Sequence, residues 1–161
     1  MNKECTESEA IFKAEAYCSQ AERCESELKI KLKQWRVPQE WWDKIINQLK
    51  ADNYISSSRY VDAFVREKYR FNKWGKQKIV QALRMKQLPE TLIQEAMDEI
   101  DREEYLLNLS SLIKRKMNDV KAKNEYERNG KLIRFALSRG FEMNDILICL
   151  KQIGCSDEYM E

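Results

Sequence analysis

The sequence contains no histidine, and it has only four glycines and two prolines among 161 residues. Without histidine, the chain lacks the usual proton shuttle, the usual base of a nucleophilic triad and the commonest metal ligand. No glycine-rich phosphate loop is present either, since Trp74-Gly75-Lys76 offers a single glycine. We therefore expect neither an enzyme nor a bound metal or cofactor, and we look for a binding function instead.

The cysteines and the lengths of the apolar runs indicate in which cellular compartment the protein works. Five cysteines, an odd number without a Cys-x-x-Cys pair, predict reduced thiols in a cytoplasmic protein. Cys18 and Cys149 lie among apolar positions and are expected to be small core residues. No apolar run approaches membrane-spanning length and no N-terminal signal is visible, so we expect no membrane contact.

What the chain does contain is a repeat. Leu28, Leu32 and Pro38 return 51 residues later as Ile79, Leu83 and Pro89. A third, looser copy aligns Ile133 and Leu137 with Ile79 and Leu83 at a spacing of 54, and Ile146, Leu147 and Leu150 with Leu92, Ile93 and Ala96. A period near fifty residues indicates stacked units, none of which buries its apolar face alone.

The composition indicates that these units are helical. Few turn-forming residues and many Glu, Lys, Leu and Gln residues favour helix over strand. The sequence therefore predicts an all-α chain of three tandem three-helix repeats, over residues 1–55, 56–102 and 103–161. We expect these repeats to stack into an elongated, monomeric array.

Local signals place the helices. Ser19-x-x-Glu22 predicts a capping box at the start of the second helix. Ser56-Ser57-Ser58 predicts the start of a helix that runs to about Phe71, with Val61, Phe64, Val65 and Lys68 on its inner face. In the third repeat, the first helix is expected to run from about Glu103 to Lys123.

The small net charge of +2 conceals blocks of opposite sign. Residues 56–88 carry nine Lys/Arg against two Asp/Glu, residues 89–107 one against seven, and residues 108–139 nine against three. Such blocks often do no more than solvate helix faces. Two basic blocks in equivalent repeats nevertheless favour an acidic or polyanionic partner.

The spacing of the cations suggests where this partner binds. Helical spacing places Arg59, Arg66, Arg70 and Lys73 along one face, and Trp74, Lys76 and Lys78 follow directly. Such a face suits phosphates and a stacked base, or an acidic protein groove, while Trp74 could equally plug the junction of two helices. The third repeat offers a second basic surface at Lys114, Arg115, Arg128 and Lys131.

Several motifs of the chain form a recognisable pattern: Asn53-Tyr54-Ile55, Arg59-Tyr60, Ala63-Phe64-Val65-Arg66, Phe71-Asn72-Lys73-Trp74-Gly75 and Arg139-Gly140-Phe141. On these motifs, the central repeat resembles that of the RecX family of bacterial regulators. Ser56, Ser57 and Ser58 stand where the family has acidic residues, and Ala82 stands where it has another. The resemblance covers roughly residues 10–155 and implies tandem three-helix repeats in a curved, right-handed array.

The same resemblance implies a function. Proteins of this kind lie in the groove of the RecA recombinase filament on DNA and inhibit strand exchange, ATP hydrolysis and coprotease activity. Two alternatives stay open on the residues alone. The chain could bind single- or double-stranded DNA directly through its basic faces, or it could be a helical adaptor for another partner.

Overall fold

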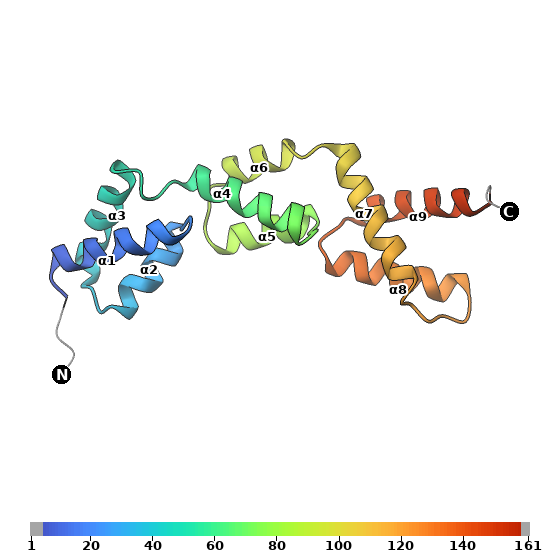
Figure 1. Cartoon of the computed structure of the whole chain (residues 1–161), viewed down its shortest axis with the longest axis horizontal. Helices are drawn as coiled ribbons and strands as arrows, with labels where there is room; N and C mark the ends of the chain where they lie inside the picture. Colours follow the sequence, from blue (N-terminus) through green and yellow to red (C-terminus); the bar gives the residue numbers. More distant parts are fainter. Residues whose placement is uncertain (1–4, 159–161) are drawn as a thin grey trace. The chain divides into compact units, whose positions relative to one another are not determined.

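The protein is all-α, as the composition predicts (Figure 1). The computed structural model describes residues 5–158, and their side chains as far as residue 154. Within this part of the chain there are nine α-helices and no strand. The α-helices are α1 Glu7–Gln20, α2 Glu25–Gln34, α3 Trp42–Ala51, α4 Ser57–Arg66, α5 Lys76–Met85, α6 Glu90–Asp98, α7 Arg102–Met117, α8 Glu125–Ser138 and α9 Met143–Glu158. A 3-10 turn, η1 Gln39–Trp41, precedes α3, and a π-helical turn, η2 Glu67–Phe71, extends α4.

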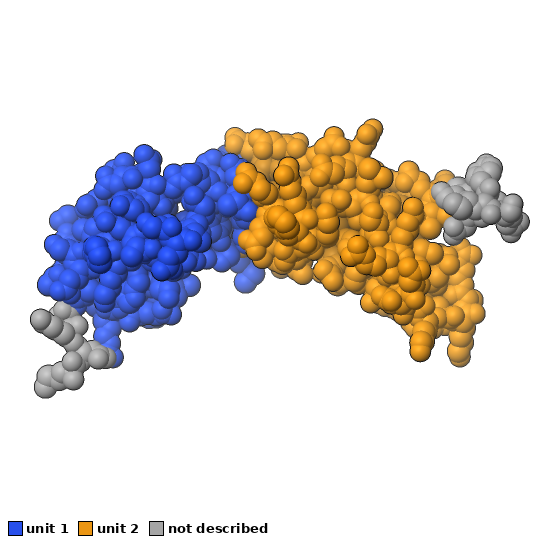
Figure 2. All heavy atoms as spheres, in the orientation of Figure 1, with its two compact units in different colours: residues 1–64, 83–93 blue, residues 65–82, 94–161 orange. Residues whose placement is uncertain are grey.

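The helices follow one another in threes, which we call the first set (α1–α3), the second set (α4–α6) and the third set (α7–α9). The predicted boundary after residue 55 falls between α3 and α4, and the one after residue 102 falls at the first residue of α7. By contacts, the chain divides differently, into unit 1 (residues 1–64 and 83–93) and unit 2 (residues 65–82 and 94–161; Figure 2). The boundaries between the three repeats therefore remain a prediction.

The same turn ends the second helix of each set. Arg36, Gln87 and Gly140 each follow such a helix with a positive φ, of 59°, 64° and 96°. A buried apolar residue comes next in each case: Val37, Leu88 or Phe141. A left-handed residue after a helix satisfies carbonyl groups at the helix end, and this turn marks corresponding positions in the three sets.

This turn corrects the predicted register of the third copy. Gly140 lies 53 residues after Gln87, and the buried residues Leu132 and Ala136 lie 53 residues after Ile79 and Leu83. The predicted equivalents Ile133 and Leu137 are wrong by one residue, and Leu137 is 41% exposed. With the same spacing of 53, the buried residues Ile146 and Cys149 align with Ile93 and Ala96, and Leu147 lies outside the core.

The core of unit 1 lies between the first three helices. Its buried residues are Cys5, Ala10, Ala14, Cys18, Leu28, Leu32, Val37, Ile45, Ile46, Leu49 and Ile55. Trp41 and Trp42 are partly buried against this cluster, and Trp42 Nε1 donates a hydrogen bond to the Val37 carbonyl at 3.0 Å. The predicted capping box at Ser19 is wrong, because Ser19 lies in the last turn of α1 and its hydroxyl donates to the Glu15 carbonyl. Helix α2 begins later, at Glu25, and is preceded by the N-cap residue Cys24, whose backbone N–H donates to Glu27 Oε1 at 3.1 Å.

In unit 2, helices α7, α8 and α9 pack on one another. Fully buried residues include Tyr105, Leu109, Ile113, Leu132 and Phe141, with the Tyr105 and Phe141 rings 5.2 Å apart. Helix α7 ends at Met117, earlier than the predicted Lys123. At the start of the third set, Arg102 Nη2 lies 2.6 Å from Oδ1 of the buried Asp145. None of the described helices is long and apolar enough to cross a membrane.

Candidate functional site

The three arginines of the predicted cationic row, on α4 and η2, are all exposed but differ in their bonding. Arg59 is held within unit 1, since its Nε lies 3.0 Å from Glu22 Oε1 and its Nη2 donates to the Asn53 carbonyl at 2.7 Å. Arg66 and Arg70 are exposed, and neither forms an ion pair with any residue that the structure describes. Arg59 therefore stabilises the start of α4, and the charges available to a partner lie further along.

The chain does not leave α4 as an α-helix. Residues Glu67–Phe71 form a π-helical turn, with the Asn72 N–H donating to the Glu67 carbonyl at 3.2 Å. Lys73 follows with a φ of 56°, and the Trp74 N–H donates to the Lys68 carbonyl at 2.9 Å. Isolated π turns inside helices occur frequently at functional sites. This one sets the directions of Arg70 and Lys73, two of the predicted site residues.

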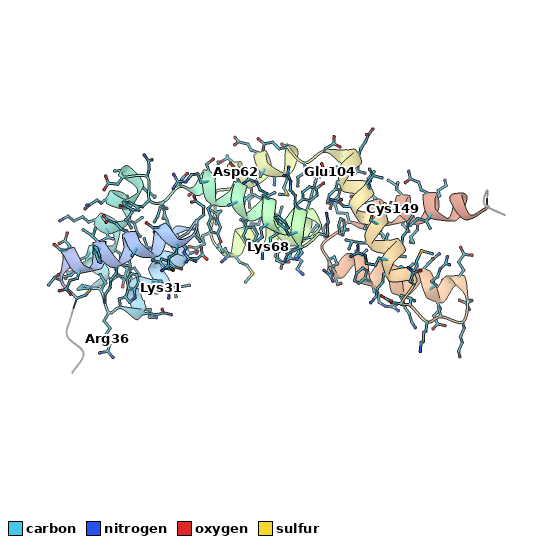
Figure 3. All side chains as sticks on the ribbon, viewed as in Figure 1. Lys31, Arg36, Asp62, Lys68, Glu104 and Cys149 are labelled. Atoms are coloured by element: carbon cyan, nitrogen blue, oxygen red, sulfur yellow. The ribbon has the colours of Figure 1, made fainter. Side chains whose placement is uncertain are left out.

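Trp74 is half-buried and interacts with cations of its own unit. The ammonium nitrogens of Lys68 and Lys78 lie 5.0 and 4.4 Å from the centroid of its ring. Both distances are within the range of a cation–π interaction. Lys68, labelled in Figure 3, is predicted on the inner face of the helix, but its contact with the ring has no signal in the sequence. A base that stacked on Trp74 would have to share the ring with these two lysines.

Lys76 is positioned by Tyr105 of α7. Its backbone N–H donates to the Tyr105 hydroxyl at 3.0 Å, and its ammonium lies 5.0 Å from the centre of the Tyr105 ring. Burial raises the pKa of Tyr105 to about 12, although the hydrogen bond from Lys76 opposes that shift. The phenol therefore stays neutral at physiological pH and serves to hold the start of α5.

Two glycines fix the start of α5 to the end of α8, in what we call the glycine joint (Gly75 and Gly140). The Gly75 N–H donates to the Arg139 carbonyl at 2.7 Å, and the Gln77 N–H donates to the Gly140 carbonyl at 3.0 Å. A Cβ atom at Gly75 would lie 2.3 Å from the Gly140 carbonyl carbon, and one at Gly140 would lie 2.4 Å from Lys78 Cβ. Only glycine allows this approach. The joint holds Lys76 and Lys78 in a fixed place within unit 2.

The second predicted surface, on the third set, is partly used within the protein. Lys131 donates to the Lys121 carbonyl at 2.6 Å and lies 3.5 Å from Glu127, while Arg128 is half-buried. Lys114 and Arg115 are exposed in the last turn of α7. Lys116 and Arg139, which were not predicted, lie 5.0 and 5.2 Å from the centroid of the Phe135 ring. Lys114 and Arg115 are therefore the members of this surface best placed to meet a partner.

The cysteines belong to the core. Cys5, Cys18, Cys24 and Cys149 are buried and free, and the side chain of Cys155 lies outside the described residues. Burial raises the pKa of Cys18 to about 11 and also raises the pKa of Cys149. These two thiols are thus protonated and unreactive at neutral pH. No group of three His, Cys, Asp or Glu side chains that could hold a metal occurs in the described part of the chain.

Comparison with known proteins assigns the family. The sequence model of the second three-helix domain of RecX matches residues 58–97, and that of the third three-helix domain matches residues 103–150. Together these matches cover more than half of the chain. The chain belongs to the RecX family. The family resemblance seen in the sequence is thereby confirmed.

Individual relatives agree with this assignment. The regulatory protein RecX of Clostridium acetobutylicum is 26% identical over 149 residues, which cover 89% of this chain and 68% of the relative. That of Bacillus cytotoxicus is 26% identical over 144 residues, which cover 89% and 53%. The chain thus spans about half to two thirds of the length of these curated RecX proteins.

Solved RecX structures show the same fold. The crystal structure of RecX from Lactobacillus salivarius superposes with a TM-score of 0.83 at 19% identity, over 92% of this chain and 97% of that one. Another crystal structure of a regulatory protein RecX gives a TM-score of 0.80 at 23% identity, over 89% and 74%. The curated relatives are named regulatory protein RecX, and the prediction that the chain is a non-enzymatic regulator agrees with this family.

Proposed function

We propose that this protein binds the RecA recombinase filament and inhibits its recombination and ATPase activities. The observation that carries the proposal is the match of the second and third three-helix sets to the RecX family. The exposed arginines of the second set, next to lysines held by the glycine joint, support this proposal. The binding would take place in the cytoplasm, where RecA works, with the protein acting as a monomer.

The surface proposed to meet the filament, which we call the filament-binding face, lies in unit 2. It consists of Arg66, Arg70, Lys73, Trp74, Lys76 and Lys78. Arg66 and Arg70 are exposed and steer the encounter with an acidic surface. Lys78 and Trp74 are part of a packed arrangement and lose little conformational freedom on binding. Arg59, whose side chain is bonded to Glu22 and Asn53, is left out of this face.

A second contact is proposed at Lys114 and Arg115 of α7, supported by Arg128 and Lys131 of α8. A filament offers the same binding site on successive protomers. Once one contact of a chain has formed, the effective concentration of the second contact is high, so the two together bind more tightly than either one alone. Occupying the filament in this way would hinder the second DNA strand and the protomer movements that accompany ATP turnover. Inhibition would then require no catalysis by the bound protein.

The test is ATP hydrolysis by RecA on single-stranded DNA, with increasing amounts of this protein. We expect inhibition at ratios well below one molecule per RecA protomer, because one bound regulator affects several neighbours in a filament. Unchanged hydrolysis, together with no detectable binding to preformed filaments, would overturn the proposed function.

Direct binding to DNA is the second candidate, because exposed cations that suit carboxylates also suit phosphates. Arg66, Arg70, Lys114 and Arg115 are all exposed. If they contact phosphates, affinity for bare DNA should fall steeply with salt, with a slope of about 0.7–0.9 in log–log form for each phosphate neutralised. Tight binding to bare DNA without an effect on RecA would favour this candidate.

A further inference from the structure

An aromatic ring protrudes from the middle of the filament-binding face. Phe71, the last residue of the π-helical turn, is 79% exposed. Burying a phenyl side chain is ordinarily worth about 1.5–3 kcal/mol, so leaving one in water forgoes that stabilisation. Two residues earlier, Tyr69 is buried at 6% exposure.

Of the two rings, the more polar one, Tyr69, is buried and the less polar one, Phe71, is exposed. The Tyr69 hydroxyl is buried and finds no hydrogen-bond partner among the described residues. Its ring instead stacks near Tyr105, with the centroids 6.4 Å apart. Burying an unpaired hydroxyl costs free energy, and leaving a phenyl ring in water forgoes the free energy of its burial. This turn therefore buries the more polar ring and exposes the less polar one.

The π-helical turn keeps Tyr69 on the buried face of α4 and ends at an exposed ring. Val61, Val65 and Tyr69 follow one another four residues apart, and all three are buried. The turn ends at Phe71, which is exposed. Isolated π turns occur frequently at functional sites.

The neighbours of Phe71 define what it can bind. Arg70 is exposed beside it, and Lys73 follows two residues later. Cores of protein interfaces are enriched in aromatic side chains and arginine, and their hot spots sit within a rim that excludes water. We propose that Phe71 is the apolar anchor of the filament-binding face, and that it inserts into an apolar socket of the partner protein rimmed by carboxylates. This inference rests on the proposed function and names the residue at its centre.

A protein socket fits these surroundings better than a nucleic-acid base. Glu67, in the same π-helical turn, lies 3.8 Å from the Lys68 ammonium and has a 63% exposed side chain, so both signs of charge occur around Phe71. Single-stranded nucleic acid is held by aromatic rings set in a uniformly positive groove. Mixed charge around one protruding ring suits the mixed surface of a protein.

The experiment measures dissociation of the full chain from RecA filaments on single-stranded DNA. The variant is Phe71→Ala, and its matched control is Met85→Ala, because Met85 is also 79% exposed but lies on α5 outside the face. We expect Phe71→Ala to dissociate at least 10-fold faster at every salt concentration, with an unchanged melting temperature. Phe71→Leu should recover much of the loss, and Met85→Ala should behave as wild type.

Salt separates the anchor from the charges around it. Arg70→Gln should weaken binding more at low salt than at high salt, whereas the loss in Phe71→Ala should be the same at both. If Phe71→Ala dissociated from the filament at the wild-type rate while Arg70→Gln bound more weakly, the role of Phe71 as anchor would be overturned and the proposed function would still stand. A tenfold loss of affinity for oligo-dT alone would place a base on Phe71 and overturn the protein socket. Failure of the wild-type chain to bind filaments would overturn both proposals.

Discussion

At the scale of single residues, two glycines have roles that the others lack. Gly75 and Gly140 meet backbone to backbone, and a Cβ on either would overlap atoms of the other chain segment. Gly130, by contrast, lies inside α8, where a Cβ would meet only the flexible end of Arg134 at 3.7 Å. The number of glycines in a sequence therefore says little until the position of each one is known.

We expect Gly75→Ala to destabilise the protein by more than about 2 kcal/mol, because the glycine joint must open to admit a methyl group. Gly130→Ala is the matched control and should raise stability by up to about 1 kcal/mol, since alanine favours a helix interior. Thermal and urea unfolding measure both effects. A Gly75→Ala variant as stable as wild type would show that the joint is looser than its hydrogen bonds indicate.

The exposed arginines give a second prediction at the residue scale. Changing both Arg66 and Arg70 to Glu should weaken inhibition of RecA, more at low salt than at high salt, because attraction becomes repulsion. The melting temperature should hardly change, since surface substitutions usually alter stability by no more than about 0.5 kcal/mol. Lys33→Glu with Arg36→Glu makes the same change in net charge outside the face and should inhibit normally. Full inhibition by the Arg66 and Arg70 variant would move the interface to Lys114 and Arg115.

At the scale of helices, each set buries the same position of its second helix. Leu32, Leu83 and Ala136 are equivalent, and all three are at most 2% exposed. Four residues before each of them lie Leu28, Ile79 and Leu132, also fully buried. The repeat in the sequence therefore arises from the buried face of the second helix of each set.

Leu32→Ala, Leu83→Ala and Leu132→Ala should each cost about 2–5 kcal/mol of stability, because each leaves a cavity in a packed core. Leu137→Ala, on the same helix as Leu132 but 41% exposed, should cost clearly less. Equilibrium unfolding of the four variants decides between the two registers of the third copy. Equal losses at Leu132 and Leu137 would contradict the register given by Gly140.

The same helices show how much of the fold could be predicted from the sequence. The prolines and the 51-residue spacing were enough for the first two copies, because Leu28, Leu32 and Pro38 return without a gap. The third copy failed by one residue, since the spacing there is 53 and both Leu132 and Ile133 are apolar. The π-helical turn could not be predicted, because no local signal in the sequence marks where the α-helix changes to the wider turn. The cationic face was found by spacing, but the internal bonds of Arg59 depend on Glu22, 37 residues away.

At the scale of the whole molecule, the repeat predicts an elongated monomer. A compact protein of 161 residues would have a radius of gyration of about 15 Å. Small-angle scattering should give a clearly larger value, and light scattering should give the mass of one chain, 19.3 kDa. A radius near 15 Å, or the mass of a dimer, would contradict the array.

The glycine joint also limits how repeats of this kind can be exchanged. The positions equivalent to Gly75 and Gly140 one repeat earlier are Cys24 and Gln87, which lie 51 and 53 residues before them. Both carry side chains, and the Cys24 N–H bonds to Glu27 of its own helix instead of to a neighbouring set. The third set therefore needs a preceding set that has glycine at its connection. A chimera that places it directly after the first set would lack a fitting neighbour, so the order of these modules is built into two backbone positions.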